Sequence, residues 1–213
     1  MIIAIDGPAA AGKGTLAKRL AEYFDLAYLD TGTLYRAVAL ILIKNGIDPN
    51  NEIAAERASA ELNLMSLTDP DLRLESVANA ASIVAAMPRV RANLLLFQRK
   101  FATNIPPGKD GVILDGRDIG TVVCPDADIK FYVTATPEVR AERRLAETDG
   151  HLLVQSKASV IAEIKRRDER DINRKNAPLR PAENALLLDT SKLDIDAVFL
   201  RAVELVRQNY QPQ

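Results

Sequence analysis

The 213-residue sequence predicts an α/β protein built on a five-stranded parallel sheet with helices on both faces. Two observations lead to this fold class. Short apolar runs alternate with segments of helical periodicity, and the runs are apolar throughout, as strands are when both faces of a sheet are covered. Ligands of such sheets bind beyond the carboxyl ends of the strands. Strands are expected over residues 2–6, 27–29, 112–115, 129–133 and 186–189, and helices near residues 13–24, 33–44, 89–103, 137–147, 156–171 and 195–208.

The first strand runs into a phosphate-binding pattern, because Gly7, Gly12 and Lys13 stand as G-x-x-x-x-G-K requires. Backbone N–H groups of such a loop converge on phosphate oxygens, the lysine adds a positive charge, and the next helix directs its positive end at the anion. A glycine-rich turn that binds nothing is the alternative, but strand, loop, lysine and helix together favour phosphate binding. The predicted phosphate-binding residues are Gly7, Pro8, Ala9, Ala10, Ala11, Gly12, Lys13, Gly14 and Thr15.

The helix after this loop has Leu16, Leu20 and Phe24 at helical spacing, as an amphipathic helix does. Gly14 follows the lysine, and the hydroxyl comes one residue later, at Thr15. The pattern therefore excludes direct Mg²⁺ ligation by the residue next to Lys13.

Two segments interrupt the alternation of strands and helices and divide the chain. Residues 46–75 are expected to form a small insert with a short helix and a hairpin. The strands of the hairpin, residues 62–65 and the Leu-Arg-Leu segment 72–74, flank the proline turn at residues 68–71. Residues 148–157 are weakly apolar, lie between two arginine-bearing helices and are expected to form a lid. The core of this single domain is then residues 1–45, 76–147 and 158–213.

Charged residues stand where strands are expected to end. Arg117 follows the strand over 112–115, and its planar fork suits phosphate oxygens, although an internal Arg–Asp ion pair is the alternative. Three strands end in an acidic residue: Asp6, Asp115 and Asp189. Each carboxylate could lie at the ligand site or could simply cap a helix or turn, and for Asp189 we favour the cap or turn. Arg36, on the helix after the second strand, is a second candidate for a phosphate.

The helix over 156–171 and the residues after it are rich in arginine. Arg167, Asp171 and Arg174 are spaced i, i+4 and i+7, which predicts one helix face with two donors and one acceptor for a polar ligand. The neighbouring cations Arg166 and Arg170 are expected at the surface, where ion pairs contribute only a few tenths of a kcal/mol, roughly.

Composition excludes several classes of protein. The net charge of −1 gives no basic field for nucleic acid. Cys124 and His151 each occur alone, which excludes an intrachain disulfide and a Cys/His zinc site and fits a reducing compartment. No signal-peptide pattern and no apolar run of membrane-spanning length is present, so a cytoplasmic location without a membrane or nucleic-acid partner is expected.

Six motifs resemble those of the bacterial cytidylate kinases, which are nucleoside-monophosphate kinases, and they occur in the family's order along the chain. The blocks at residues 77–82 (Val-Ala-Asn-Ala-Ala-Ser) and 115–123 (Asp-Gly-Arg-Asp-Ile-Gly-Thr-Val-Val) are far more specific than the phosphate loop. The other matching segments are residues 5–15, 29–36, 88–91 and 167–174.

The resemblance implies a three-layer P-loop NTPase fold with a lid and a short insert for the monophosphate. It implies transfer of a phosphoryl group from ATP, with Mg²⁺, to CMP or dCMP by a protein that we expect to be a monomer. Lys13, Arg117, Arg140 and Arg144 would be catalytic, and Thr15 or Asp115 would contribute to the metal site, through water if not directly. Arg36 and Arg117 would hold the acceptor phosphate; Thr31, Arg91, Asp118 and Arg174 the cytosine; and Ser82, Arg167 and Asp171 the sugar.

Two departures from the family pattern concern the acceptor side. The family often has serine where this chain has Thr31, whose methyl group would tighten the base pocket, and the insert is short, with a reduced sheet expected. The nearest rival is a phosphate-loop kinase for AMP, UMP or shikimate. A nucleotide-binding switch is the rival from another class, but the Asn-Lys-x-Asp guanine reader of GTPases does not occur in the sequence.

Overall fold

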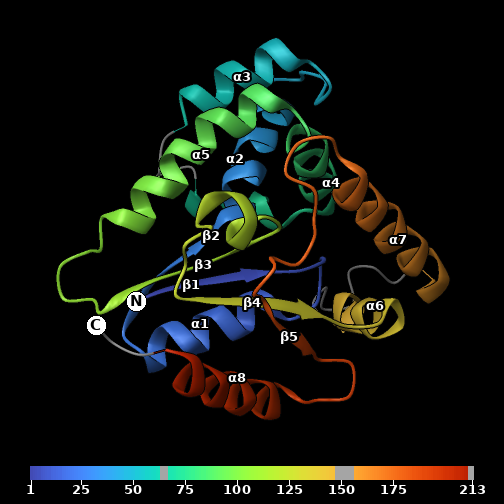
Figure 1. Ribbon diagram of the computed structural model, residues 1–213. Coiled ribbons are helices and arrows are strands. Elements are labelled where there is room, and N and C mark those ends of the chain that lie inside the picture. The colour runs from blue at the N-terminus through green and yellow to red at the C-terminus, as the bar shows by residue number, and fades with distance from the viewer. Residues whose placement is uncertain (63–66, 147–155, 211–213) are drawn as a thin grey trace. The chain divides into compact units, whose positions relative to one another are not determined.

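The structure is a computed structural model that describes residues 1–62, 67–146 and 156–210 (Figure 1). Two compact units make up the chain. The first combines Met1–Leu29 with Ile105–Gln213, and the second is Asp30–Asn104.

The first unit contains the predicted sheet. Its strands are β1 (Ile2–Asp6), β2 (Leu26–Asp30), β3 (Gly111–Gly116), β4 (Ile129–Thr134) and β5 (Leu186–Asp189), in the order β2-β3-β1-β4-β5. β1 runs parallel to β3 and β4, with Asp6 opposite Gly116 and Tyr132. The segments that follow these three strands therefore leave the sheet at one edge.

The sheet is covered on both faces, as predicted. α1 (Lys13–Tyr23) and α8 (Ile195–Asn209) share one apolar cluster with the sheet, in which Leu20 and Val206 join Phe131 (Figure 1). Ala4 and Leu114, which are register partners outside this cluster, have no exposed surface, so the other face is closed as well. Burying both faces is what requires the strands to be apolar throughout.

Two arginine-bearing helices complete the first unit. α6 (Pro137–Ala146) and α7 (Lys157–Asn173) pack through Ala141, Val160 and Ile164. Of the predicted lid, residues 148–155 lie outside the described residues. Ser156 caps α7 by accepting the N–H of Ser159 at 3.1 Å.

Helices make up the described part of the second unit: α2 (Thr31–Lys44), α3 (Glu52–Ala60), the 3₁₀ helix η2 (Pro70–Arg73), α4 (Glu75–Val84) and α5 (Pro88–Thr103). α2 packs on α4, and their cluster includes Leu34, Val38, Val77 and Ala81. Asp30 and Asn51 cap α2 and α3 by accepting the backbone N–H groups of residues 33 and 54. The helix expected within 46–75 is thus present as α3.

The predicted hairpin and reduced sheet are wrong for the described residues of the segment. Residues 72–74, expected as a strand, belong to η2 and to the residue that leads into α4. Asp69 accepts the N–H of Asp71 at 3.0 Å and Pro70 begins the turn, so local capping decides in favour of a helix and buries Leu72. α4 was not predicted, although Val77, Ala81 and Val84 share one helix face.

No single helix in the described ranges is long and apolar enough to cross a membrane. α4 and α5 meet the criteria of length and composition only as a pair, and the pair is bent by 101°. Both helices bury residues in the core of their own unit, including Val84 and Leu94.

The close approach of β1 and β4 predicts the effect of a substitution at Gly7. Gly7 has φ +150°, and a Cβ there would lie 1.9 Å from the carbonyl oxygen of Val133. We expect Gly7→Ala to lower the free energy of unfolding by about 3 kcal/mol, since backbone must move. Urea denaturation measures this.

Gly108→Ala is the control, because Gly108 also has a positive φ, of +80°, but no described heavy atom lies within 4 Å of its added Cβ. It should cost about 1 kcal/mol from backbone strain alone. Equal losses in the two variants would contradict the close contact.

Candidate active site

The phosphate-binding pattern forms a turn between β1 and α1. Ala10 and Gly12 take left-handed backbone conformations, with φ of +57° and +88°. Gly12 is the N-cap residue of α1 and supplies no side-chain cap. Such a helix start presents backbone donors and a positive dipole end to an anion.

Lys13 is held across this loop. Its Nζ donates to the carbonyl oxygen of Pro8 at 2.8 Å, and only 7% of the residue is exposed. The ammonium group therefore stays with the loop, where a phosphate would need it.

Arg140 of α6 holds the same loop through a hydrogen bond to a loop carbonyl. Its Nη1 donates to the carbonyl oxygen of Ala9 at 3.2 Å and its Nε to that of Ala135 at 2.9 Å. Asp168 of α7 accepts from Nη1 and Nη2 at 3.1 and 2.6 Å. The resemblance implies a catalytic role for Arg140, but here its guanidinium is buried among protein oxygens, whereas Arg144 is half-buried on the same helix.

A second anchor, which the sequence analysis missed, joins Arg143 to the loop through Thr190. Arg143 donates to the hydroxyl and the carbonyl oxygen of Thr190, both at 2.8 Å. The Thr190 hydroxyl lies 3.2 Å from the carbonyl oxygen of Ala11 and 3.1 Å from that of Thr134, to one of which it donates. The only signal in the sequence is a threonine directly after the strand predicted over residues 186–189.

The ion pair left open as an alternative for Arg117 is present. Arg117 Nε donates to Asp171 Oδ2 at 3.0 Å, and Nη1 donates to the carbonyl oxygen of Gly116 at 3.2 Å. Asp171 is buried, whereas the Arg117 side chain keeps 19% of its surface exposed. The pair fixes the guanidinium at the carboxyl end of β3 and leaves part of it accessible.

Burial and charge oppose one another in this pair. Burial alone would raise the pKa of the Asp171 carboxyl, but Arg117, Arg167 and Arg174 outweigh it and hold that pKa below its ordinary value. Burial would lower the pKa of Arg117, but nearby carboxylates, led by Asp171, raise it. Both groups therefore stay charged at neutral pH.

Arg174 pairs with Asp118, although not from the helix face that was predicted. α7 ends at Asn173, so Arg174 is the C-cap residue in an extended conformation. Its Nε donates to the carbonyl oxygen of Ala177 at 2.6 Å and its Nη2 to Asp118 Oδ1 at 3.4 Å. Of the three residues predicted to share one helix face, only Arg167 and Asp171 lie on the helix. Arg174 lies beyond its end and approaches Asp118 from there.

Asp6, at the end of β1, caps an element that the sequence did not predict. Residues Ile119–Val123 form a π-helical turn, η3, and Asp6 accepts the N–H groups of Ile119 at 2.7 Å and Gly120 at 2.8 Å. Burial raises the pKa of Asp6 to about 6, against these two bonds and the charge of Lys13, which lower it. Asp189 is a turn carboxylate, as favoured, and accepts from Ser191.

Asp115 brings a carboxylate close to the start of α1. Tyr28 OH donates to Asp115 Oδ1 at 3.2 Å, and Oδ2 would lie 3.7 Å from a Cβ built on Gly14. Thr15 is exposed on the same helical turn. A carboxylate and a hydroxyl are hard oxygen donors, so this donor set fits Mg²⁺, which takes few protein ligands and keeps waters and phosphates for the rest. No cluster of three or more His, Cys, Asp or Glu that could hold a metal exists in the described residues.

The second unit carries the remaining predicted residues on three helices: Thr31 and Arg36 on α2, Ser82 on α4 and Arg91 on α5. Arg91 is buried, donates to the carbonyl oxygen of Ala85 at 3.3 Å and lies 5.7 Å from the ring centre of Tyr35. Ser82 Oγ is buried and makes no hydrogen bond with any described residue. A ligand hydroxyl could satisfy it.

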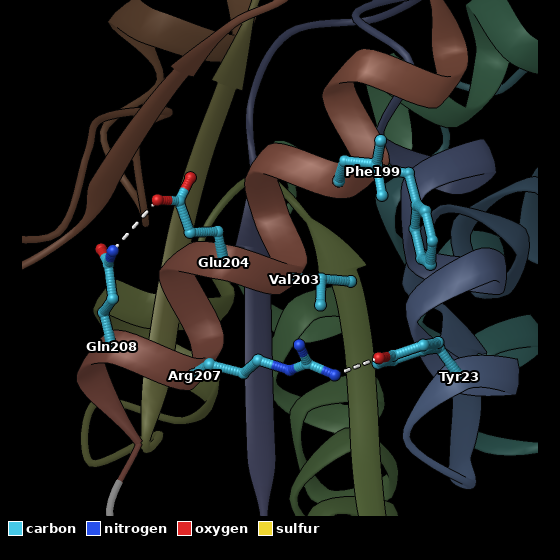
Figure 2. Close-up of a pocket in the computed structure, with 7 residues that line it drawn as sticks. Tyr23, Phe199, Val203, Glu204, Arg207 and Gln208 are labelled. Atoms are coloured by element: carbon cyan, nitrogen blue, oxygen red, sulfur yellow. Dashed lines mark hydrogen bonds between the residues drawn. The ribbon is translucent and has the colours of Figure 1, made fainter.

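A separate cavity of about 310 Å³ lies between α1 and α8 (Figure 2). Tyr23 and Phe199 meet edge to face in its wall, and Arg207 donates to the Tyr23 hydroxyl. None of the predicted site residues lines it. We assign it no role in binding the nucleotides.

Comparisons with known proteins agree along nearly the whole chain. A family model described as Cytidylate kinase matches residues 3–208. A protein described as Cytidylate kinase from Paramagnetospirillum magneticum is 55% identical over 205 residues, covering 96% of this chain and 97% of that one. Another, from Bradyrhizobium diazoefficiens, is 52% identical over 206 residues, covering 97% and 95%. The crystal structure of an uncharacterized protein from Eubacterium ventriosum has a TM-score of 0.56 at 14% identity, covers 97% of this chain and 98% of its own, and shares the fold.

The buried carboxyl of Asp6 predicts a pH dependence of stability. A pKa raised from 3.8 to about 6 on folding means that the folded state binds the proton more tightly, so stability falls as pH rises from below 4 to above 6. The difference corresponds to about 3 kcal/mol. Relative to Asp6→Asn, which does not titrate, the free energy of unfolding of the wild type should drop by most of this amount between pH 4 and pH 7.

Denaturant unfolding at several pH values gives the free energy of unfolding of the wild type and of the variant. Subtracting one from the other removes the contributions of the other titrating groups, which the two proteins share. A difference that does not change with pH would show that the carboxyl keeps its ordinary pKa.

Proposed function

The chain belongs to the cytidylate kinase family, and on this premise we propose how its residues carry out the reaction. The enzyme transfers the γ-phosphoryl group of ATP to CMP, giving ADP and CDP. The observation that supports this assignment best is the pair of Arg–Asp contacts after β3, Arg117–Asp171 and Arg174–Asp118, on the strand next to the one that ends in the phosphate loop. A loop for one phosphate and a group of charged side chains for a second nucleotide are what a nucleoside-monophosphate kinase needs.

Asp118 and Arg174 suit cytosine. The exocyclic amine of the base donates, and a carboxylate accepts from it; the ring O2 and N3 accept, and a guanidinium donates to them. The side chains of Arg174 and Asp118 are 6% and 7% exposed, so they would contact the base in a site with little competing water. Thr31 and Arg91 would complete the base pocket with further donors.

Arg117 and Arg36 would bind the acceptor phosphate. Arginine forks fit phosphate oxygens, and Asp171 holds the Arg117 fork in place before the phosphate arrives. Ser82, whose hydroxyl lacks a hydrogen-bond partner in the described structure, would bind the sugar together with Arg167 and Asp171.

The donor side is the loop at residues 7–15. Its backbone N–H groups and Lys13 would hold the β- and γ-phosphates of ATP. Arg140 would position the loop through Ala9, and Arg144 would contact the transferred group. Thr15 and Asp115 would hold Mg²⁺, through water where they do not reach it; the ion, when bound, neutralises charge on the phosphates.

The reaction needs no strong general base. The phosphate of CMP is already ionised near neutral pH, so the protein has to align the two phosphates and neutralise the charge between them. Arg117 stays charged beside Asp171, and the Lys13 ammonium group is held at the loop by the carbonyl oxygen of Pro8. They would hold the oxygens in line for the transfer.

We propose further that dCMP is also an acceptor and that the enzyme is a cytoplasmic monomer that binds neither nucleic acid nor membrane. A coupled assay of ADP release with CMP, dCMP, UMP, AMP and shikimate tests the function. Stimulation by CMP and dCMP above the others is expected. No stimulation by any of them would favour a nucleotide-binding module instead.

Removing the cation on either side of the transfer should slow it strongly. We expect Lys13→Ala or Arg117→Ala to lower kcat/KM for CMP by at least about two decades, roughly 3 kcal/mol of transition-state stabilisation. Lys18→Ala, an exposed lysine on α1, and Arg201→Ala, an exposed arginine on α8, are matched controls. Near-normal activity of the Lys13 or Arg117 variant would contradict the role assigned to that residue.

Asp118 should determine the choice of base. Asp118→Ala removes the acceptor for the exocyclic amine, so the ratio of kcat/KM for CMP to that for UMP should fall by about tenfold or more. Asp126→Ala, an exposed aspartate before β4, should leave the ratio unchanged. If the Asp118 variant keeps the wild-type ratio, other residues read the base.

A further inference from the structure

Asp6 joins the two halves of the proposed site, and the phosphoryl transfer as described gives it no role. It is the last residue of β1, directly before the phosphate loop, and it is 3% exposed. Its two oxygens accept the N–H groups of Ile119 and Gly120, which directly follow Asp118. One side chain thus connects the donor loop with the segment that reads the acceptor.

The capping of η3 is divided between two aspartates. Asp118 is the N-cap residue by backbone, since its carbonyl oxygen accepts the N–H of Val122 at 2.9 Å. An N-cap aspartate ordinarily accepts the first free N–H groups of its helix with its own carboxylate. Here Asp118 makes no such bond, and its carboxylate pairs with Arg174, because Asp6 occupies those N–H groups from the neighbouring strand.

We propose that Asp6 is a positioning residue that caps η3 in place of Asp118, and so keeps the Asp118 carboxylate directed at the cytosine while tying Arg117 and Asp118 to the phosphate loop. This inference rests on the proposed function, because it takes Asp118 as the reader of the base. The bonds of 2.7 and 2.8 Å are short, as charge-assisted bonds are, and their burial protects them from water.

Asp6 could accept two buried N–H groups only to stabilise the fold, so the test must separate an effect on stability from an effect on the choice of base. Asp6→Asn keeps the shape of the side chain but places an NH₂ group against one of the two N–H donors. At pH 8, where the wild-type carboxylate is ionised, we expect KM for CMP to rise about tenfold and KM for ATP to change less than twofold. The preference for CMP over UMP should fall about tenfold as well.

Asp189→Asn is the matched control. Asp189 ends β5, at the same edge of the sheet, and accepts from Ser191 N at 2.9 Å and Ser191 Oγ at 2.6 Å. The same substitution there removes the charge of a turn carboxylate without touching η3, so both KM values and the preference should stay at wild-type level. Equal changes in the two variants, or an unchanged CMP preference in Asp6→Asn, would overturn the proposal.

A double variant tests whether Asp6 acts through Asp118. In an Asp118→Ala background, Asp6→Asn should cause no further loss of preference, because the group that it positions is gone. Independent, multiplicative losses would overturn the proposal. The wild type is measured in the same assay, so a failure of the proposed function appears as no CMP-stimulated turnover, whereas a failure of this inference appears as an active wild type and an indifferent variant.

If Asp6→Asn does not fold, hydrogen exchange in the wild type decides. The amides of Ile119 and Gly120 should exchange slowly in the free protein and in the CMP complex, since Asp6 holds both in the working geometry. Exchange of these two amides at the rate of exposed amides in the CMP complex would overturn the proposal.

Discussion

The parallel pairing of β1 with β3 is the constraint on which the proposed site depends. Because Asp6 lies opposite Gly116, the phosphate loop that follows one strand and the Arg117–Asp118 segment that follows the other leave the sheet at the same edge. Burial of both faces fixes this register, since a slip by one residue would turn every side chain of an apolar strand to the other face. The register that stabilises the sheet is therefore also the one that would align the two phosphates in the proposed site.

The proposed site holds its charges in pairs. Arg117–Asp171, Arg174–Asp118 and Arg140–Asp168 are all largely buried, and removing two charges from water costs about as much as their attraction returns. Their contribution is better understood as orientation. Each carboxylate holds a planar guanidinium in one direction. A nucleotide would therefore meet donors that are already in place, and binding would cost less entropy for ordering these side chains.

Local patterns in the sequence predicted the parts of the structure that local rules determine. The five strands, the phosphate loop and most helices follow from apolar periodicity and glycine spacing. The segment around Asp69 was misread because an alternating Leu-Arg-Leu pattern fits a strand, while the cap of η2 is decided by one carboxylate and one proline. The contacts of Asp6 with η3 and of Thr190 with the loop span more than 100 residues, and no pattern within a single segment can indicate which distant amide a buried carboxylate meets.

The anchors of the phosphate loop follow one electrostatic rule. A carbonyl oxygen that faced a phosphate would repel it, so a loop that binds an anion has to direct its carbonyls elsewhere. In this chain Lys13 binds the carbonyl of Pro8 and Arg140 that of Ala9, and the Thr190 hydroxyl, held by Arg143, lies beside that of Ala11. Arg140 and Arg143 come from one helix and act on two points of the loop. The sequence pattern of the loop indicates which backbone segment can bind a phosphate. The direction of its carbonyl groups depends on α6, since Arg140 lies 131 residues from Ala9 in the sequence.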